Sequence, residues 1–578
     1  MIDSFENIDN RFGVKIDPDG YEKRLKEVSS YVRMYERDYE LNENNSYKLK
    51  QTSGIPVIAE RKYGLFGKFN KVYLYPFHEH TIIWGGSGSG KTQTVVYPLL
   101  QSILDARENA VIHDCKLELI ESFGSKFKEA GYNVIVINFT DPRHSHRWNP
   151  FDYPTKLWKD TLKSHGITNP QRFREVKPDL SRAIEVFKDC AINLCYEEDN
   201  DRNSYFWKGA GNMMAGACLL LAEEGKFDCI NGRGIQMVYA MDKADQAKGT
   251  VLSKFISTCR QIDDESTIQI NTYLNADVMT RGNIESTFRQ KVDILSSNPD
   301  MRYITSGSDF DLIDIFEKQT VVFLLTQDFK DQYNPLVTLF LKQLYEVGCQ
   351  LTLMGRYKSW PYKMNWVLEE MGVLPEIKNF KNIYNAARAR GLTIYGFMQS
   401  MADMVDKYEL TGTKTILENC RAQIVVHAEN EDTRAYIRER VGKTLLWDKS
   451  SKRYKELPLL SEAKMNMFEK GKVIFTFAGQ KPYIAKLPQY KQYSFYKEPD
   501  KRILYRQDMF GEEGRKYKEN EIKWFEEMNT IIGRNGAINK FRRSSQPKSN
   551  AQGKLLKPLS ETKQAERAYI NKTIEMTE

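Results

Sequence analysis

An eight-residue segment, GGSGSGKT at residues 85–92, constrains the fold more than any other feature of the sequence. It follows a short apolar run, TIIW at residues 81–84, and leads into a run with helical spacing at residues 93–104. Glycine lets a loop curl so that successive backbone N–H groups point toward one anion, and the amino end of the next helix adds positive potential. The pattern therefore predicts a strand, a phosphate-binding loop and a helix, in that order.

Every residue of this loop is a candidate contact for ATP. The glycine-rich backbone would surround the β-phosphate, the ammonium of Lys91 would reach the β- and γ-phosphates, and the hydroxyl of Thr92 would ligate Mg²⁺. The predicted nucleotide-binding residues are Gly85, Gly86, Ser87, Gly88, Ser89, Gly90, Lys91 and Thr92.

Such a loop needs carboxylates at the end of another strand, and residues 364–370, MNWVLEE, are the best candidates. We expect Glu369 to help hold Mg²⁺ and Glu370 to polarise the attacking water. Another apolar run ends at Gln399, whose amide is expected to contact the γ-phosphate. A solvated acidic strand end and a simple turn residue are the alternative interpretations of these positions.

Short apolar runs, rich in β-branched and aromatic residues, recur from about residue 73. Runs that are apolar at nearly every position are typical of strands buried on both faces of a sheet. Helical segments separate several of them, one with Asn334 as expected N-cap and Pro335 in its first turn. The predicted fold is therefore α/β, a mostly parallel sheet flanked by helices. The expected strands are residues 81–84, 110–114, 134–139, 320–325, 365–369, 392–397, 423–427 and 473–477.

Residues 158–300 interrupt this alternation, because their apolar residues follow helical spacing. We expect an all-α domain inserted there. The expected organisation is an N-terminal extension (1–60), the first part of a nucleotide-binding domain (61–157), the inserted domain (158–300), the second part (301–500) and a basic, disordered tail (501–578).

Composition excludes several protein classes. With 41% hydrophobic and 28% charged residues, the chain is neither collagen-like nor disordered throughout. Its longest apolar run, residues 213–222, is about half of the roughly 20 residues that a membrane span requires, and the first residues do not resemble a secretory signal. The eight cysteines form no C-x-x-C pair, so neither a zinc ribbon nor a disulfide framework is indicated. A cytoplasmic location is expected, and a net charge of +8 permits contact with nucleic acid without requiring it.

Six short segments stand out in a fixed order. They are HTIIW at 80–84 with the loop that follows, DCKLE at 114–118, WNPF at 148–151, EEMGVLP at 369–375, ARARG at 387–391 leading to Gln399, and ENC at 418–420. Their order resembles that in the TraG/TraD-like coupling proteins of conjugative type IV secretion systems. The resemblance covers about residues 75–490 and departs from the family in three ways. The usual DPKGE is DCKLE here, the usual Asp-Glu is Glu369-Glu370, and the family's N-terminal pair of membrane helices is not found.

The resemblance implies a RecA-like P-loop ATPase that translocates DNA and acts as a hexameric ring, with the isolated chain a possible monomer. In such rings a neighbouring subunit supplies an arginine to the γ-phosphate, and Arg388, three positions before Gly391, matches it. Pairing of Arg388 with a carboxylate of its own subunit is the alternative. The implied partners are a relaxase with single-stranded DNA, a secretion channel, and a membrane protein that recruits the chain to the inner face of the cell membrane.

The leading interpretation is an ATP-driven protein that delivers a relaxase–DNA complex to a conjugative secretion channel. Two alternatives stay open. One is a RecA-like pump for double-stranded DNA, of the segregation or packaging type. The other is a nucleotide-gated docking platform that hydrolyses ATP slowly, because Glu369 replaces the usual aspartate.

Overall fold

The computed structural model describes residues 2–3, 40–41, 47–48, 53–60, 69, 71–75, 79–168, 179–196, 204–240, 251–327, 331–377, 379–448, 452–466, 468, 471–479, 482–493, 496 and 498. The described residues form two compact units, one of those up to residue 146 and from residue 309 onward, the other of those between residues 147 and 308. The predicted tail at 501–578 and most of the predicted extension at 1–60 lie outside the described residues. The predicted domain limits stay a prediction.

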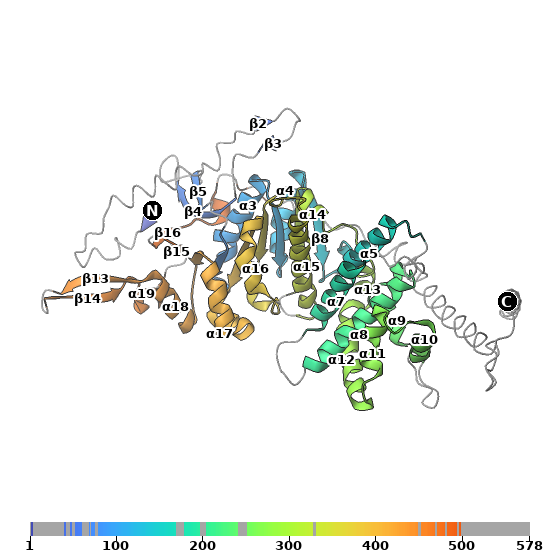
Figure 1. Ribbon diagram of the computed structural model, residues 1–578. Helices are drawn as coiled ribbons and strands as arrows, with labels where there is room; N and C mark the ends of the chain where they lie inside the picture. Colours follow the sequence, from blue (N-terminus) through green and yellow to red (C-terminus); the bar gives the residue numbers. More distant parts are fainter. Residues whose placement is uncertain are drawn as a thin grey trace, which may run out of the picture. The chain divides into compact units, whose positions relative to one another are not determined.

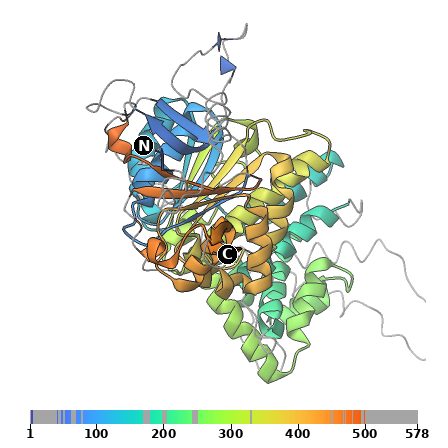
Figure 2. The same cartoon turned by 90° about the vertical axis from the view of Figure 1, so that its left-hand side faces the viewer.

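A ten-stranded sheet organises the first unit. Its seven strands from β12 to β8 run parallel, and β15, β16 and β1 extend it with antiparallel pairs. Strands from distant parts of the chain share this sheet, which Figure 2 shows from the side of β15 and β16 (orange). The predicted α/β fold with a mostly parallel sheet is confirmed, and each expected strand is present. In spatial order the strands are β1 (Ile2–Asp3), β16 (Tyr483–Lys486), β15 (Lys472–Phe477), β12 (Ala422–Val425), β6 (Thr81–Trp84), β11 (Leu392–Met398), β10 (Met364–Leu368), β7 (Asn109–Asp114), β9 (Thr320–Leu325) and β8 (Asn133–Asn138).

Helices cover both faces of the sheet, which explains why its strands are apolar at nearly every position. On one face, Phe127 of α4 (Glu118–Glu129) packs against Phe323 of β9, with ring centroids 6.2 Å apart. On the other, Tyr345 of α15 (Asn334–Leu353) lies 6.5 Å from the ring of Trp366 in β10. Figure 1 shows these helices beside the sheet.

The start of α15 differs by one residue from the prediction. The helix begins at Asn334, so Tyr333 occupies the N-cap position, and Pro335 lies in the first turn as expected. The amide of Asn334 does not cap the helix: its Oδ1 has no hydrogen-bond partner among the described residues, and its Nδ2 donates to the carbonyl of Val373 at 3.3 Å.

The remaining described elements of this unit lie outside the ten-stranded sheet. Strands β4 and β5 form a separate antiparallel pair, and Ile55 and Val57 of β4 are buried in the core of the unit. The elements are β2 (Glu40–Leu41), β3 (Tyr47–Lys48), β4 (Ile55–Glu60), β5 (Lys71–Tyr75), η2 (Thr92–Val96), α3 (Tyr97–Asp105), η3 (Pro142–His144), α14 (Asp314–Glu317), η6 (Met371–Val373), α16 (Phe380–Ala386), η7 (Arg388–Arg390), α17 (Met401–Asn419), α18 (Glu431–Val441), β13 (Lys443–Asp448), β14 (Arg453–Pro458), α19 (Glu462–Asn466) and η8 (Tyr490–Gln492).

The second unit is helical throughout its described residues. Its central helix, α8, is buried nearly all round, and glycines let its neighbours approach closely. A Cβ at Gly216 would lie 2.7 Å from Ile270 of α11, and one at Gly211 would lie 2.6 Å from Ile192 of α7. The helices are α5 (Asp152–Ser164), α7 (Ser181–Cys195), α8 (Ser204–Glu223), η5 (Phe227–Cys229), α9 (Gly232–Ala240), α10 (Val251–Cys259), α11 (Glu265–Leu274), α12 (Val278–Ser296) and α13 (Pro299–Ile304).

Within the described part of the chain, no helix has both the length and the apolar character needed to cross a bilayer.

Candidate functional site

The glycine-rich loop follows β6 at the carboxyl edge of the parallel strands. Its first N–H, from Gly85, donates to the carbonyl of Met398 at the end of β11 (3.0 Å). Gly88 and Gly90 have φ values of 71° and 91°, which glycine adopts without strain. The helix after the loop opens as the π-turn η2 before α3 begins, a departure that is frequent at functional sites.

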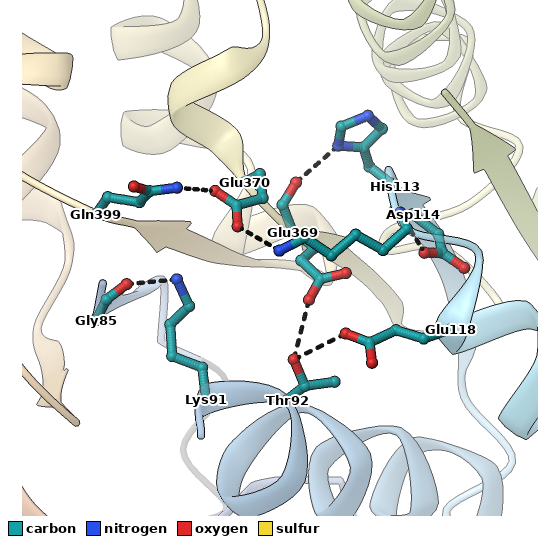
Figure 3. Close-up of polar contacts among 10 residues, drawn as sticks. Gly85, Lys91, Thr92, His113, Asp114, Glu118, Glu369, Glu370 and Gln399 are labelled. Atoms are coloured by element: carbon teal, nitrogen blue, oxygen red, sulfur yellow. Dashed lines mark hydrogen bonds and ion pairs between the residues drawn. The ribbon is translucent and has the colours of Figure 1, made fainter. Parts of the chain in front are cut away.

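Lys91 lies buried beneath this loop. Its Nζ donates to the carbonyl oxygen of Gly85 (Figure 3), and burial lowers the pKa of its ammonium while the charge of Glu370 opposes that shift. A Cβ at Gly85 would lie 2.7 Å from Cγ of Lys91, so the glycine makes room for the lysine. The structure thus places the predicted lysine at the loop.

The carboxylate pair at the end of β10 reaches the same place. Strand β11 lies between β6 and β10, and all three point their carboxyl ends to one edge of the sheet. The hydroxyl of Thr92 lies 3.3 Å from Oε1 of Glu369 and 3.1 Å from Oε1 of Glu118 (Figure 3). Residues far apart in sequence therefore meet around one threonine hydroxyl.

Glu369 has the environment of a cation ligand. Burial, with the nearby charges of Asp114 and Glu118, raises the pKa of its carboxyl to about 8. Its Oε2 is buried and has no hydrogen-bond partner among the described residues. A divalent cation between Glu369 and the Thr92 hydroxyl would supply that partner and would favour the ionised carboxylate.

No group of three or more His, Cys, Asp or Glu side chains in the described residues is arranged to hold a metal by itself. Mg²⁺ keeps several water ligands and is usually bound through one or two protein oxygens together with phosphate oxygens. The oxygens of Thr92 and Glu369 fit that role.

Glu370 is held from both sides. Its Oε2 accepts from Nε2 of Gln399 at 2.6 Å, and its Oε1 pairs with Nζ of Lys116 at 2.9 Å. Burial alone would raise the pKa of this carboxyl, but the hydrogen bonds from Gln399 and Lys116 and the charge of Lys91 outweigh burial and lower it. The residue also has a left-handed backbone (φ 53°, ψ 46°), which is uncommon outside glycine and is often found at functional sites. Glu370 is therefore an ionised, oriented carboxylate.

Sequence reasoning did not assign Lys116 and Glu118 to the site. Both follow β7, and the loop that carries them is fixed because buried Asp114 accepts N–H bonds from Lys116, Leu119 and Ile120. Burial raises the pKa of Asp114 to about 6. One signal could have found them, since polar residues after parallel strands collect at the same edge of a sheet.

His113, the residue before Asp114, supports the acidic strand end. Its Nδ1 lies 2.8 Å from the carbonyl oxygen of Glu369 and its Nε2 lies 2.9 Å from the Thr326 hydroxyl. Complete burial lowers its pKa to about 4, so the imidazole is neutral at pH 7. It fixes the backbone of Glu369 without adding charge.

Arg388 is not brought to this site. It lies in η7, before the amino end of β11, whereas Met398 at the other end of the strand adjoins the glycine-rich loop. Its Nη1 lies 3.7 Å from Oε1 of Glu79, and the same oxygen lies 3.1 Å from Nε of Arg421. Strand β11 separates Arg388 from the site of the same chain by about 20 Å, at about 3.3 Å per residue.

A family model described as "Type IV secretory system Conjugative DNA transfer" matches residues 40–509. Two curated proteins named VirD4, from Rhizobium rhizogenes and Agrobacterium fabrum, are each 22% identical to the chain over 367 residues. These matches include 63% of this chain and 49% of each relative, so the chain spans about half the length of the curated relatives it matches.

Solved structures of the plasmid coupling protein TrwB share the fold. The complex with ADP and Mg²⁺ gives a TM-score of 0.55 at 14% identity, covering 81% of this chain and 98% of TrwB. The unbound TrwBdeltaN70 gives a TM-score of 0.54 at 14% identity, covering 74% of this chain and 88% of the TrwB chain. At this identity the likeness establishes the fold alone.

Proposed function

Because the chain belongs to the type IV secretory system conjugative DNA transfer family, we propose that it is an ATP-driven coupling protein. Its cargo would be a relaxase bound to single-stranded DNA, which it would deliver to a conjugative secretion channel. The resemblance to TraG/TraD-like proteins inferred from the sequence is confirmed by this family match. Relaxase recruitment, a membrane-bound recruiting partner and a place at the inner face of the cell membrane are parts of the proposal that the resemblance alone supports.

The meeting of Thr92, Glu369 and Glu370 at one edge of the sheet carries this proposal. ATP and Mg²⁺ are the expected ligands, and TrwB structures with ADP and Mg²⁺ and with a non-hydrolysable ATP analogue support the same ligands here. Lys91 would exchange the Gly85 carbonyl for phosphate oxygens, and Thr92 and Glu369 would hold the metal. Glu370, ionised and fixed by Gln399, would accept a hydrogen bond from the attacking water.

We further infer that active subunits form a hexameric ring, as the family resemblance implies. Arg388 lies about 20 Å of β-strand away from its own site, at about 3.3 Å per residue, so in a ring it would act on the nucleotide of a neighbouring subunit. Its contact with Glu79 would then hold the guanidinium in place until a phosphate is offered.

Two observations favour the slower docking platform as a second candidate. Lys116 occupies one oxygen of Glu370, and Glu369 has a raised pKa, so the site as it stands is not poised for fast hydrolysis.

Steady-state ATP hydrolysis of the full chain tests the proposal. Wild type should be compared with Lys91→Ala and with Lys128→Ala, a control lysine exposed on α4. Each is measured with single-stranded DNA, with duplex DNA and without DNA, across a salt series. We expect wild type and the control to hydrolyse ATP, Lys91→Ala to be inactive, and single-stranded DNA to stimulate most strongly at low salt, because phosphate contacts release counterions.

Other outcomes select the alternatives. Stronger stimulation by duplex DNA would favour the double-stranded DNA pump. Cargo binding that depends on nucleotide, without hydrolysis above that of Lys91→Ala, would favour the docking platform. Absence of both nucleotide binding and hydrolysis in wild type would contradict all three.

A further inference from the structure

Lys116 is a second lysine of the site, and the proposed hydrolysis has not yet used it. It stands between Asp114 and Glu118, in a loop fixed by the N–H bonds to Asp114 and by the left-handed backbone of Leu117 (φ 64°). The backbone of Lys116 is therefore fixed, while its long side chain extends to Glu370.

The two side chains of this ion pair, Lys116 and Glu370, differ in how tightly their surroundings hold them. The side chain of Glu370 is 6% exposed and has a second hydrogen bond, to Gln399, whereas the side chain of Lys116 is 39% exposed. A change of partner would therefore move the lysine and leave the carboxylate where it is.

The negative charge of a bound nucleotide would favour such a change of partner for Lys116. Around Glu370 lie two ammonium groups, Lys91 and Lys116, and a second carboxylate, Glu369, close enough for each charge to shift the pKa of others. Without a nucleotide, the ammonium of Lys116 is paired with the ionised carboxylate of Glu370. A nucleoside triphosphate adds several negative charges, more than one Mg²⁺ neutralises, and phosphate oxygens then compete with Glu370 for the movable ammonium.

We propose that Lys116 is a second phosphate-binding lysine, which neutralises Glu370 in the nucleotide-free subunit and turns to the terminal phosphate of a bound nucleoside triphosphate. This rests on the proposed function of the site. The transfer frees Oε1 of Glu370 to accept a hydrogen bond from water, so the carboxylate becomes available only when a terminal phosphate is present. In the proposed site Glu370 would face the attacking water, so its partner Lys116 would lie beside the terminal phosphate, and a diphosphate would not draw it away.

Equilibrium binding of Mg–ADP and of a non-hydrolysable Mg–ATP analogue tests this assignment. Lys116→Met should weaken binding of the analogue about tenfold and of ADP less than about twofold, since one charge-assisted bond to the terminal phosphate is lost. Lys116→Arg should keep the preference for the analogue, and Lys128→Met is the control. An equal loss for both nucleotides, or no loss, overturns the proposal.

A double-mutant cycle isolates the competition between Glu370 and phosphate. Glu370→Gln should strengthen analogue binding about fivefold when Lys116 is present and much less in the Lys116→Met background, because no lysine remains to be released. Equal effects in both backgrounds overturn the exchange. If the proposed function fails, wild type binds neither nucleotide. If only this inference fails, wild type binds both nucleotides tightly and through Lys91, but the effects of the Lys116 and Glu370 substitutions on binding are independent of each other.

Discussion

The hydroxyl of Thr92 lies 3.1 Å from Oε1 of Glu118, a carboxylate that the glycine-rich motif does not contain. The same hydroxyl lies 3.3 Å from Glu369, and with one hydrogen it can donate to only one of them at a time. If a cation occupies a lone pair of the Thr92 oxygen near Glu369, the hydrogen is left to point at Glu118. Glu118 is thus placed to orient the threonine for metal binding.

Glu118→Ala should lower the hydrolysis rate about tenfold at limiting Mg²⁺, because a hydrogen bond to a charged group contributes about 1.5–3 kcal/mol. Raising the Mg²⁺ concentration should restore part of the rate. Glu121→Ala is the matched control, since Glu121 lies in the same first turn of α4 and shares its effect on the helix dipole. Equal behaviour of the two variants would assign Glu118 to helix stability alone.

Glu370→Gln should abolish most hydrolysis and keep nucleotide binding. General-base assistance contributes about 10²–10⁴ in rate, and the amide keeps the size of the side chain but cannot take a proton. Single-turnover hydrolysis and equilibrium binding, measured on the same preparation, check both halves. Retention of more than about a tenth of the rate would exclude Glu370 as the base.

Arg388 should act between subunits. Arg388→Ala and Lys91→Ala should each be inactive alone, yet a mixture should recover activity, because a Lys91→Ala subunit still offers its arginine to the intact site of an Arg388→Ala neighbour. Arg421→Ala breaks the same cluster around Glu79 and should keep most of the activity. A mixture no more active than its components would contradict the shared site.

His80 should make the first unit less stable as the pH falls from about 6.5 to 4. Burial, aided by the charge of Arg388, lowers the pKa of His80 to about 4, and its Nδ1 accepts from the N–H of Ile394 at 3.1 Å. Between these pH values the unfolded chain binds a proton that the folded chain does not, so stability is lost as pH falls.

The expected loss from this one group is about 2 kcal/mol between pH 6.5 and 5, at about 1.36 kcal/mol per unit. Urea unfolding of wild type and His80→Asn at pH 7 and pH 5 measures it. The variant keeps an acceptor for Ile394 and should show the smaller drop. Identical drops would mean that His80 does not resist protonation. The variant still contains His113, whose pKa is also about 4. The drop that remains in the variant should therefore be about as large as the contribution of His80.

Much of the first unit was predictable because its strands carry their own signal. Burial on both faces makes β6, β9 and β10 apolar at all but one position each. The glycine-rich loop after β6 indicates which edge of the sheet carries the site. The loop residues and the carboxylates followed from these local patterns. The bond of Thr92 to Glu369 then followed from the parallel arrangement of β6 and β10.

The contacts of Lys116, Glu118 and Arg388 were harder to predict, because they depend on strand order rather than on local sequence. Lys116 meets Glu370 only because β7 pairs with β10, which no periodicity reveals. Glu79 meets Arg388 because β6 pairs with β11 and brings their amino ends together. The start of α15 was misplaced for a similar reason, since the Asn334 amide reaches a distant carbonyl instead of its own helix.

Strand β11 carries Gln399 just beyond one end and Arg388 just before the other. It is hydrogen-bonded along both sides, to β6 and to β10, so it can neither stretch nor slide without breaking two ladders. The separation between the two residues is therefore a fixed length of the protein. Any assembly in which Gln399 of one subunit and Arg388 of its neighbour served the same nucleotide would have to accommodate that fixed length.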